Sequence, residues 1–276
     1  MSVLQAIVLG LVQGLTEFIP ISSTAHLRII PALLGWEDPG AAASAVIQLG
    51  TLLAVLIYFW RDILRIARAF FRGIGRGKPF EEHSARLGWF IIAGSVPIGI
   101  IGLVFKDFIE GGARSLWIIA GSLIGLAILL WIAERFAARS ELRVIGDVTL
   151  RDAIVIGLGQ CLALVPGSSR AGTTIMMGLF RRLTHEAAAR FSFLLSIPAI
   201  GASGVFELFA EWDHLATLGW VPILVASIIS FLSGWASIHF LLRYLRTHTT
   251  GVFIVYRIIL GVVIIGLLAG GVLAPM

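Results

Sequence analysis

A few polar and ionisable side chains of this sequence lie inside long apolar stretches. Glu17 and His26 fall within the first 35 residues, and Arg170 falls in a later segment of similar character. An ionised side chain at the centre of a membrane span costs about 2.5–3.5 kcal/mol on insertion scales, so such residues must pair or face water. These three residues are therefore the first candidates for chemistry.

The first group is built around a carboxylate. Gln13 and Glu17 are four residues apart and share one face of a helix. The carboxylate can bind a hard cation or accept a proton, and the amide offers an oxygen ligand that does not titrate. We predict a Mg²⁺ or Ca²⁺ site with Glu17 and Gln13 as ligands. The alternative is that Glu17 only pairs with Arg170 as buried structure.

Three hydroxyl residues follow the carboxylate. Ser22, Ser23 and Thr24 come after Pro20 and precede a short apolar run. They can cap the helix that starts there, and the same helix start attracts anions. His26 would lie in the first turn, facing the same place. We predict that Ser22 and Thr24 bind phosphate and that Ser23 and His26 take part in the reaction, with a purely structural histidine as the alternative.

A later segment repeats this arrangement around a guanidinium. Arg170 carries a planar fork of donors that matches phosphate, and the small residues beside it let a backbone approach a ligand closely. Both turns would then direct N–H groups, hydroxyls and one guanidinium toward a common point, which describes an oxyanion site. The predicted phosphate-binding residues of this segment are Gly167, Ser168, Ser169, Arg170, Thr173 and Thr174.

The composition shows what must position these residues. Hydrophobic residues make up 58% of the 276 residues, and charged residues only 13%, against about 25% in a soluble domain. Most of the surface must therefore face lipid, and we predict an all-α integral membrane protein with a single membrane domain, 1–276. The net charge of +5 reflects arginines in cytoplasmic loops, so no nucleic acid partner is expected.

Arginine-rich and arginine-poor gaps between the apolar runs define a topology. With the rich gaps in the cytoplasm, the segment 152–182 begins and ends on the cytoplasmic side of the membrane. The segment 3–36 has the same shape, an apolar run, a turn and a second short apolar run. We therefore predict two re-entrant helical hairpins, with turns at 20–24 and 166–170, and both termini outside. The six predicted transmembrane helices contain the runs 44–60, 87–105, 116–134, 190–210, 220–242 and 252–273.

The two hairpin segments also share sequence. Residues 10–15 (GLVQGL) match residues 157–162 (GLGQCL), and Pro-x-Ser-Ser follows each glutamine after six or seven residues. We predict two repeats, 1–140 and 150–276, each a hairpin followed by three spans. Three is an odd number, so the repeats have inverted topology, an architecture whose sites lie at the repeat interface. The alternative is that short apolar matches arise by chance.

These motifs resemble a known family. Residues 13–26 (QGLTEFIPISSTAH) and 166–174 (PGSSRAGTT) are similar to the two signatures of the undecaprenyl-pyrophosphate phosphatases of the BacA/UppP family, and 191–198 (FSFLLSIP) resembles the stretch that follows. The resemblance implies removal of the terminal phosphate of undecaprenyl diphosphate in the bacterial plasma membrane, dependence on a divalent cation, a role in cell-wall synthesis and a link to bacitracin resistance. The family's first motif begins with Glu or Gln, so Gln13 leaves Glu17 as its only carboxylate.

Alternatives remain for both the function and the mechanism. A transporter or flippase of polyprenyl phosphate lipids could use the same basic pocket, although it has less need of Glu17 and His26. In the phosphatase, the nucleophile is either Ser23 or water, and His26 is the candidate acid/base group. The expected partners are a polyprenyl diphosphate lipid and the bilayer, with a homodimer left to be tested. The active site is expected to open to the outer face.

Overall fold

Six long helices dominate the computed structural model, which describes residues 1–105 and 115–274. These residues contain no β-strand. Each long helix has 19 to 26 residues and is apolar enough to cross a membrane, which confirms the six predicted spans. A rise of about 1.5 Å per residue makes even 19 residues nearly as long as the hydrocarbon core is thick. The six are α3 (Gly40–Tyr58), α5 (His83–Val104), α7 (Leu116–Ala137), α10 (His185–Ala210), α12 (Trp220–Tyr244) and α13 (Gly251–Ala269).

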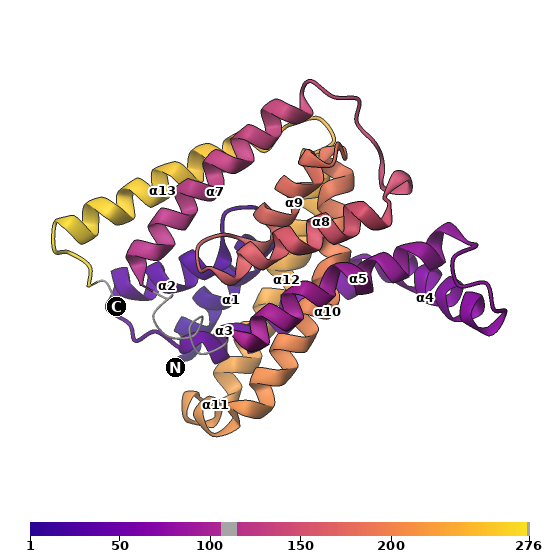
Figure 1. Ribbon diagram of the computed structural model, residues 1–276. Helices are drawn as coiled ribbons and strands as arrows, with labels where there is room; N and C mark the ends of the chain where they lie inside the picture. Colours follow the sequence, from indigo (N-terminus) through magenta and orange to yellow (C-terminus); the bar gives the residue numbers. More distant parts are fainter. Residues whose placement is uncertain (106–114, 275–276) are drawn as a thin grey trace.

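Shorter helices form two hairpins in the positions predicted from the sequence. The first joins α1 (Val3–Glu17) to α2 (Ser23–Leu34). The second joins α8 (Leu150–Gln160), its 3₁₀ extension η3 (Cys161–Leu164) and α9 (Arg170–Phe180). At about 1.5 Å per residue, none of the four helices would cross a bilayer alone. In Figure 1, α8 and α9 lie between the α7–α13 pair and the α4–α5 arm.

Two further α-helices and one 3₁₀ turn lie outside the spans and the hairpins. The first arginine-rich gap forms α4 (Trp60–Gly75), with Ile66 and Ala69 buried and its arginines exposed. The turn of 3₁₀ helix η2 (Ile145–Asp147) precedes α8, and the short helix α11 (Trp212–Leu218) joins α10 to α12. The N-terminal amine donates a hydrogen bond to the carbonyl of Leu218 at 3.2 Å. The N-terminus lies near α11, far from α4 (Figure 1).

Close helix packing holds the end of α1 in place. A Cβ atom on Gly10 would collide with the carbonyl oxygen of Ala226, and one on Gly14 would collide with the hydroxyl of Ser233. Both of these partners belong to α12, so the backbones of α1 and α12 lie in direct contact. Small residues commonly allow this approach between membrane helices. The contact anchors the helix that carries Glu17 at its last position.

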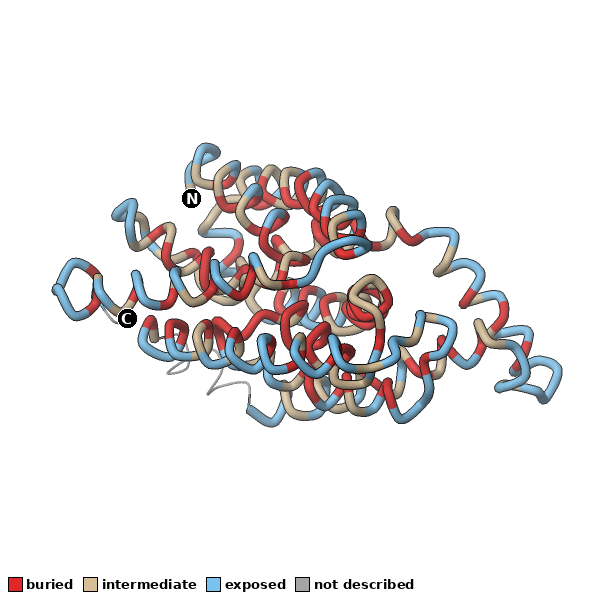
Figure 2. Tube along the Cα trace, turned by 90° about the horizontal axis from the view of Figure 1, so that it is seen from above, coloured by how far each residue is buried: buried red, intermediate tan, exposed pale blue. Residues whose placement is uncertain are grey.

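The outer surface is apolar along the length of the long helices. Leu103 is 70% exposed, Phe209 is 72% exposed and Val221 is 66% exposed. Buried residues gather where helices meet, and exposed positions alternate with them along the outer helices (Figure 2). A water-soluble protein rarely exposes contiguous apolar surface on this scale, so these faces contact lipid.

Candidate active site

The two hairpin turns adopt the same unusual backbone conformation. Ser22 has φ 74° and ψ 98°, and Ser169 has φ 68° and ψ 111°. Each serine caps the following helix, because its hydroxyl accepts a hydrogen bond from the N–H of Ala25 (3.3 Å) or Gly172 (3.1 Å). Positive φ is uncommon outside glycine and costs about 1–3 kcal/mol, so the surroundings must hold both turns in this form.

The shared geometry defines which residues of the two turns are equivalent. Each capping serine lies nine positions after a glutamine, Gln13 in the first hairpin and Gln160 in the second. Ser23 and Arg170, each directly after its cap, therefore occupy matching positions. Aligning the two Pro-x-Ser-Ser motifs would instead match Ser23 with Ser169. The structural correspondence is shifted by one residue from that motif alignment, because the proline stands one position further from the capping serine in the second turn.

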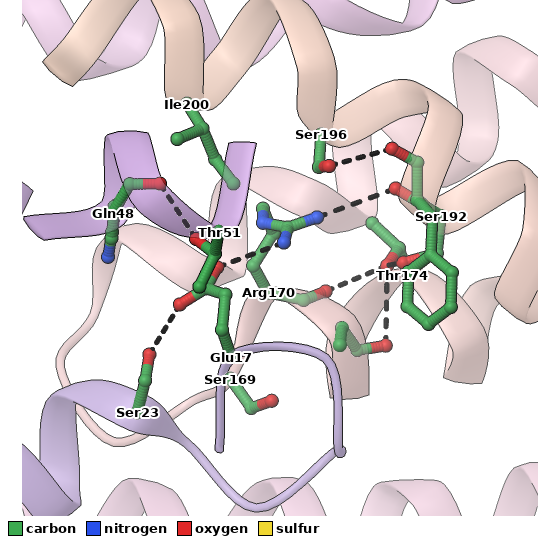
Figure 3. A network of polar contacts seen from close by, with 12 residues as sticks. Glu17, Ser23, Gln48, Thr51, Ser169, Arg170, Thr174, Ser192, Ser196 and Ile200 are labelled. Atoms are coloured by element: carbon green, nitrogen blue, oxygen red, sulfur yellow. Dashed lines mark hydrogen bonds and ion pairs between the residues drawn. The ribbon is translucent and has the colours of Figure 1, made fainter. Parts of the chain in front are cut away.

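Glu17 lies at the meeting point of the two hairpins. Its Oε1 accepts a hydrogen bond from Nη2 of Arg170 at 2.9 Å. Its Oε2 accepts from the hydroxyl of Ser23 at 2.7 Å and from Nε2 of Gln13 at 2.9 Å. The Glu17 side chain is only 4% exposed. Figure 3 shows the carboxylate between Ser23 and the guanidinium of Arg170. The ion pair of Glu17 with Arg170, which the sequence offered as the structural alternative, is present within a larger polar network.

Arg170 is held in place from behind. Its Nη1 donates to the carbonyl of Ser192 on α10 at 3.4 Å. The hydroxyls of Thr173 and Thr174 donate to the Arg170 carbonyl at 3.0 and 2.7 Å, and Thr174 also contacts the Ser192 hydroxyl at 2.6 Å (Figure 3). We expected both threonines to face phosphate. They are instead fully buried and line no part of the cavity described next, because their hydroxyls bond within α9 and to α10.

A cavity of about 680 Å³ opens in front of this network. Five residues from the two turns line its polar end, Glu17, Ser23, Thr24, Ser169 and Arg170, and Gln48, Ser95, Ser203 and Glu207 are the further polar residues of its wall. The rest of its wall is mainly apolar and comes chiefly from α5, η3 and α10; it includes Ile92, Val96, Ile98, Leu103, Leu164, Ile200 and Phe206. A molecule with an anionic head and a long hydrocarbon tail matches this division.

Besides the two threonines, three more of the predicted phosphate-binding residues do not line the cavity. Ser22, Gly167 and Ser168 are buried within the turns. Gly167 has φ 91°, and a Cβ there would collide with the hydroxyl of Ser122. The hydroxyl of Ser168 has no hydrogen-bond partner among the residues that the structure describes. Their positions indicate that they form the backbone of the turns, whereas the residues directly after the caps face the cavity.

His26 points elsewhere than the sequence suggested. Its Nδ1 lies 2.7 Å from the carbonyl oxygen of Ser22, and its Nε2 lies 2.6 Å from the hydroxyl of Tyr256 on α13. A carbonyl can only accept, so Nδ1 carries a proton, and a neutral imidazole accepts from Tyr256 at Nε2. His26 does not line the cavity. The expectation that it faces the same point as Glu17 was wrong, and its acid/base role stays a prediction.

The site offers few ligands for a metal. Within residues 1–105 and 115–274, no three His, Cys, Asp or Glu side chains gather in one place. Glu17 is the one carboxylate of its network, and the buried Oε1 of Gln13 has no hydrogen-bond partner in the described chain. Mg²⁺ is commonly held by one or two carboxylates together with substrate phosphates and water. Glu17 and Gln13 therefore fit a cation shared with a phosphate substrate, and do not form a complete protein cage.

Arg257 was not among the residues expected to be functional. This residue of α13 is fully buried, and its guanidinium donates to backbone carbonyls of α7 and of the two turns. The sequence does contain a signal for Arg257, because an ionisable residue inside the last apolar run is a functional candidate by default. Gln48 of α3, which also lines the cavity, had no comparable signal.

The fold and the site together define a class of protein. It is a multi-pass helical membrane protein with a buried carboxylate, serine and arginine at the polar head of an apolar cavity. Residues 6–263 match the family model described as "Bacitracin resistance protein BacA". The chain therefore belongs to the BacA family, which confirms the resemblance seen in the motifs.

Curated relatives agree over the full length. The chain is 55% identical to the undecaprenyl-diphosphatase of Myxococcus xanthus over 276 residues, covering all of this chain and 92% of that protein. It is 54% identical to the undecaprenyl-diphosphatase of Chlorobium limicola, with 99% of each chain covered. It is 53% identical to that of Chlorobium phaeovibrioides, with both chains fully covered.

Proposed function

We propose that this protein hydrolyses the terminal phosphate of undecaprenyl diphosphate, yielding undecaprenyl phosphate and inorganic phosphate. The observation that carries this conclusion is the cavity, whose polar head holds Glu17, Ser23 and Arg170 and whose walls are apolar. The names of the full-length relatives support the same reaction. The protein thereby recycles the lipid carrier of cell-wall synthesis, and this activity accounts for the family's link to bacitracin resistance.

The chemical step centres on the contact between Ser23 and Glu17. The Ser23 hydroxyl, or a water in its place, attacks the terminal phosphorus. The bond from that phosphorus to the bridging oxygen breaks, and the lipid monophosphate leaves. The proton of the nucleophile passes to Oε2 of Glu17, which the hydroxyl already faces at 2.7 Å. If Ser23 attacks, water then hydrolyses the phosphoserine and restores the hydroxyl. His26, which lies on the other side of the turn, would act as a further acid/base group.

Arg170 is the anion-binding group of the proposal. Its guanidinium is fixed by Glu17 on one side and by the Ser192 carbonyl on the other. A preorganised donor of this kind stabilises charge that develops on the phosphoryl oxygens and needs no rearrangement at the moment of reaction. Thr24 and Ser169 lie beside it on the cavity wall and can add hydroxyl or backbone contacts to the diphosphate.

The proposal includes a divalent cation, Mg²⁺ or Ca²⁺, to balance the negative charge of the diphosphate. Glu17 already neutralises Arg170, so a diphosphate would meet a pair with no net charge. Glu17 and Gln13 are the residues that would hold the cation, together with oxygens of the substrate. When bound, it would neutralise phosphate oxygens as a Lewis acid.

The membrane arrangement is part of the same proposal. The two hairpins are re-entrant and belong to inverted repeats, 1–140 and 150–276, whose turns meet at the site. The matching backbone of Ser22 and Ser169 supports this. Arginine-rich α4 faces the cytoplasm, both termini lie outside, and the cavity opens to the outer face of the bacterial plasma membrane.

Cysteine labelling tests this topology. In a Cys161→Ala background, a cysteine at Ser2 is expected to react with an impermeant reagent on intact cells, and one at Arg76 only after permeabilisation. Labelling of position 76 from outside would refute the arrangement. Crosslinking and mass measurement in detergent would test the homodimer, which remains a prediction.

A carrier function is less well supported. A flippase needs to hold a phosphate, which Arg170 could do. It has no use for a serine hydroxyl directed at a buried carboxylate. The two functions are separated by reconstituting the protein in vesicles and measuring phosphate release from lipid in the leaflet that the site faces.

The decisive experiment is phosphate release from undecaprenyl diphosphate by purified protein, with and without EDTA. We expect turnover that stops in chelator and returns with excess Mg²⁺ or Ca²⁺. No release under any of these conditions would refute the function, whereas full release in excess EDTA would refute only the metal.

A further inference from the structure

Arg257 is a fully buried cation that binds both hairpin turns at once. Its Nη1 donates to the carbonyl of Pro20 at 3.3 Å, and its Nη2 donates to the carbonyl of Gly167 at 3.3 Å. Its Nε and Nη2 also reach carbonyls of Leu123 (3.2 Å) and Ser122 (3.4 Å) on α7. Four bonds from one planar group hold α13, α7 and the two turns together.

The two turn carbonyls occupy equivalent positions. Pro20 lies two residues before the cap Ser22, and Gly167 lies two residues before the cap Ser169. Three residues after each carbonyl stands the side chain that contacts Glu17, which is Ser23 in one turn and Arg170 in the other. Arg257 therefore binds the same point of both turns, and each bond lies one short peptide segment from a reacting group.

The charge of Arg257 is not matched by an acid. Its four hydrogen-bond acceptors are all neutral carbonyls, and no carboxylate within residues 1–105 or 115–274 forms an ion pair with it. An unpaired buried cation opposes folding in a membrane, and an apolar side chain would avoid that cost. Its bonds to both turns place this positive charge behind the residues proposed to bind the anionic diphosphate.

We propose that Arg257 is a positioning residue with two separable effects on the reaction. Its fork holds the Pro20 and Gly167 carbonyls at a fixed separation, which places Ser23 and Arg170 on Glu17 in the geometry needed for turnover. Its unpaired positive charge adds to the attraction of the diphosphate from behind the turns. Arg257 does not line the cavity, so both effects act through the turns or through space.

Two substitutions separate these effects. Arg257→Lys keeps the charge but cannot reach four carbonyls in one plane. We expect its kcat to fall about 100-fold, as misplaced reacting groups commonly cause, with KM close to that of the wild type. Arg257→Met loses charge and fork, so the same fall in kcat is expected together with a rise of about tenfold in KM.

Hydrogen exchange followed by mass spectrometry gives a readout that does not need activity. Both Arg257 variants are expected to exchange faster than the wild type within 19–24 and 165–170, while the long helices exchange as before. Ile264→Ala is the matched control, because Ile264 is a fully buried residue of the same helix and makes no hydrogen bond to either turn. It should lower thermal stability without changing exchange in the turns or the kcat.

The proposal rests on the phosphatase function, and the exchange measurement keeps the two apart. A wild type without phosphate release would refute the function, and unchanged exchange in either turn of the variants would refute the clamp. Arg257→Lys with wild-type kcat would also overturn the proposal. So would loosening of the whole fold, or failure of both variants to fold, because Arg257 would then be only structural support.

Discussion

The two hairpin turns have the same backbone and different side chains. Ser22 and Ser169 share a positive φ and the same capping bond. In the first turn a glutamine, a carboxylate and a serine stand at the positions where the second turn has Gln160, Leu164 and Arg170. Gln13 bonds to Glu17, whereas the amide of Gln160 has no hydrogen-bond partner in the described parts of the chain.

The difference separates what a turn needs from what the reaction needs. The cap, the strained serine and the carbonyl that Arg257 binds occur in both halves, so they belong to the scaffold. The acid and the nucleophile candidate occur only in the first half, and the anion-binding cation only in the second. Neither turn alone holds a complete site, and the four predictions below test this division.

Glu17 is expected to give the largest effect. Glu17→Gln keeps the shape but removes the proton acceptor and the charge, and we expect a loss of about 10,000-fold in kcat, at the upper end of general-base contributions. Glu17→Leu, which makes the first turn match Leu164 of the second, should lose as much. Phosphate release measures both, with the exposed Glu81→Gln as control. More than a tenth of the activity in Glu17→Gln would contradict its role.

Ser23 comes next. Ser23→Ala removes the hydroxyl that faces Glu17, and a covalent route predicts a loss of at least about 1,000-fold in kcat. Rapid quench and mass spectrometry of the wild type should then find a phosphate on Ser23. A binding role predicts measurable residual turnover and no phosphoserine. A wild-type rate in Ser23→Ala would eliminate both.

The contribution of Arg170 is expected to depend on the bidentate geometry of its guanidinium. Arg170→Lys keeps a cation opposite Glu17 but loses the bidentate geometry, and we expect kcat to fall about 100-fold, as when one preorganised donor is removed. The exposed Arg65→Lys is the control, since its partner Asp62 lies outside the site. A near-normal rate would mean that Arg170 serves only as the structural partner of Glu17.

The two caps should give the smallest effect, and an equal one. Ser22→Ala and Ser169→Ala each remove one capping bond, which is expected to lower stability by about 1 kcal/mol. Thermal unfolding in detergent would measure both, with the exposed cap Ser2→Ala as a reference. If one substitution lowered the stability several times more than the other, the two caps would not have the same structural role despite their shared backbone.

Much of this site could be predicted from local sequence. Glu17, Ser23 and Arg170 stood out because polar groups in apolar runs need partners, and the structure brings them together. The direction of His26 could not be predicted, because it depends on Tyr256, 230 residues away on α13. Thr173 and Thr174 were expected to bind phosphate but are buried. Hydroxyl residues are favoured both at helix starts and in binding loops, so their type did not show which of the two they serve.

The sequence by itself determined the six apolar spans, the two hairpin segments and the family. Length, hydropathy and charge are local properties, and the membrane acts on them directly. Only the tertiary structure decided which hydroxyls face the cavity and that Arg257 joins both turns. Those outcomes depend on how α7, α10 and α13 pack around the hairpins, and packing joins residues whose separation along the chain carries no periodic signal.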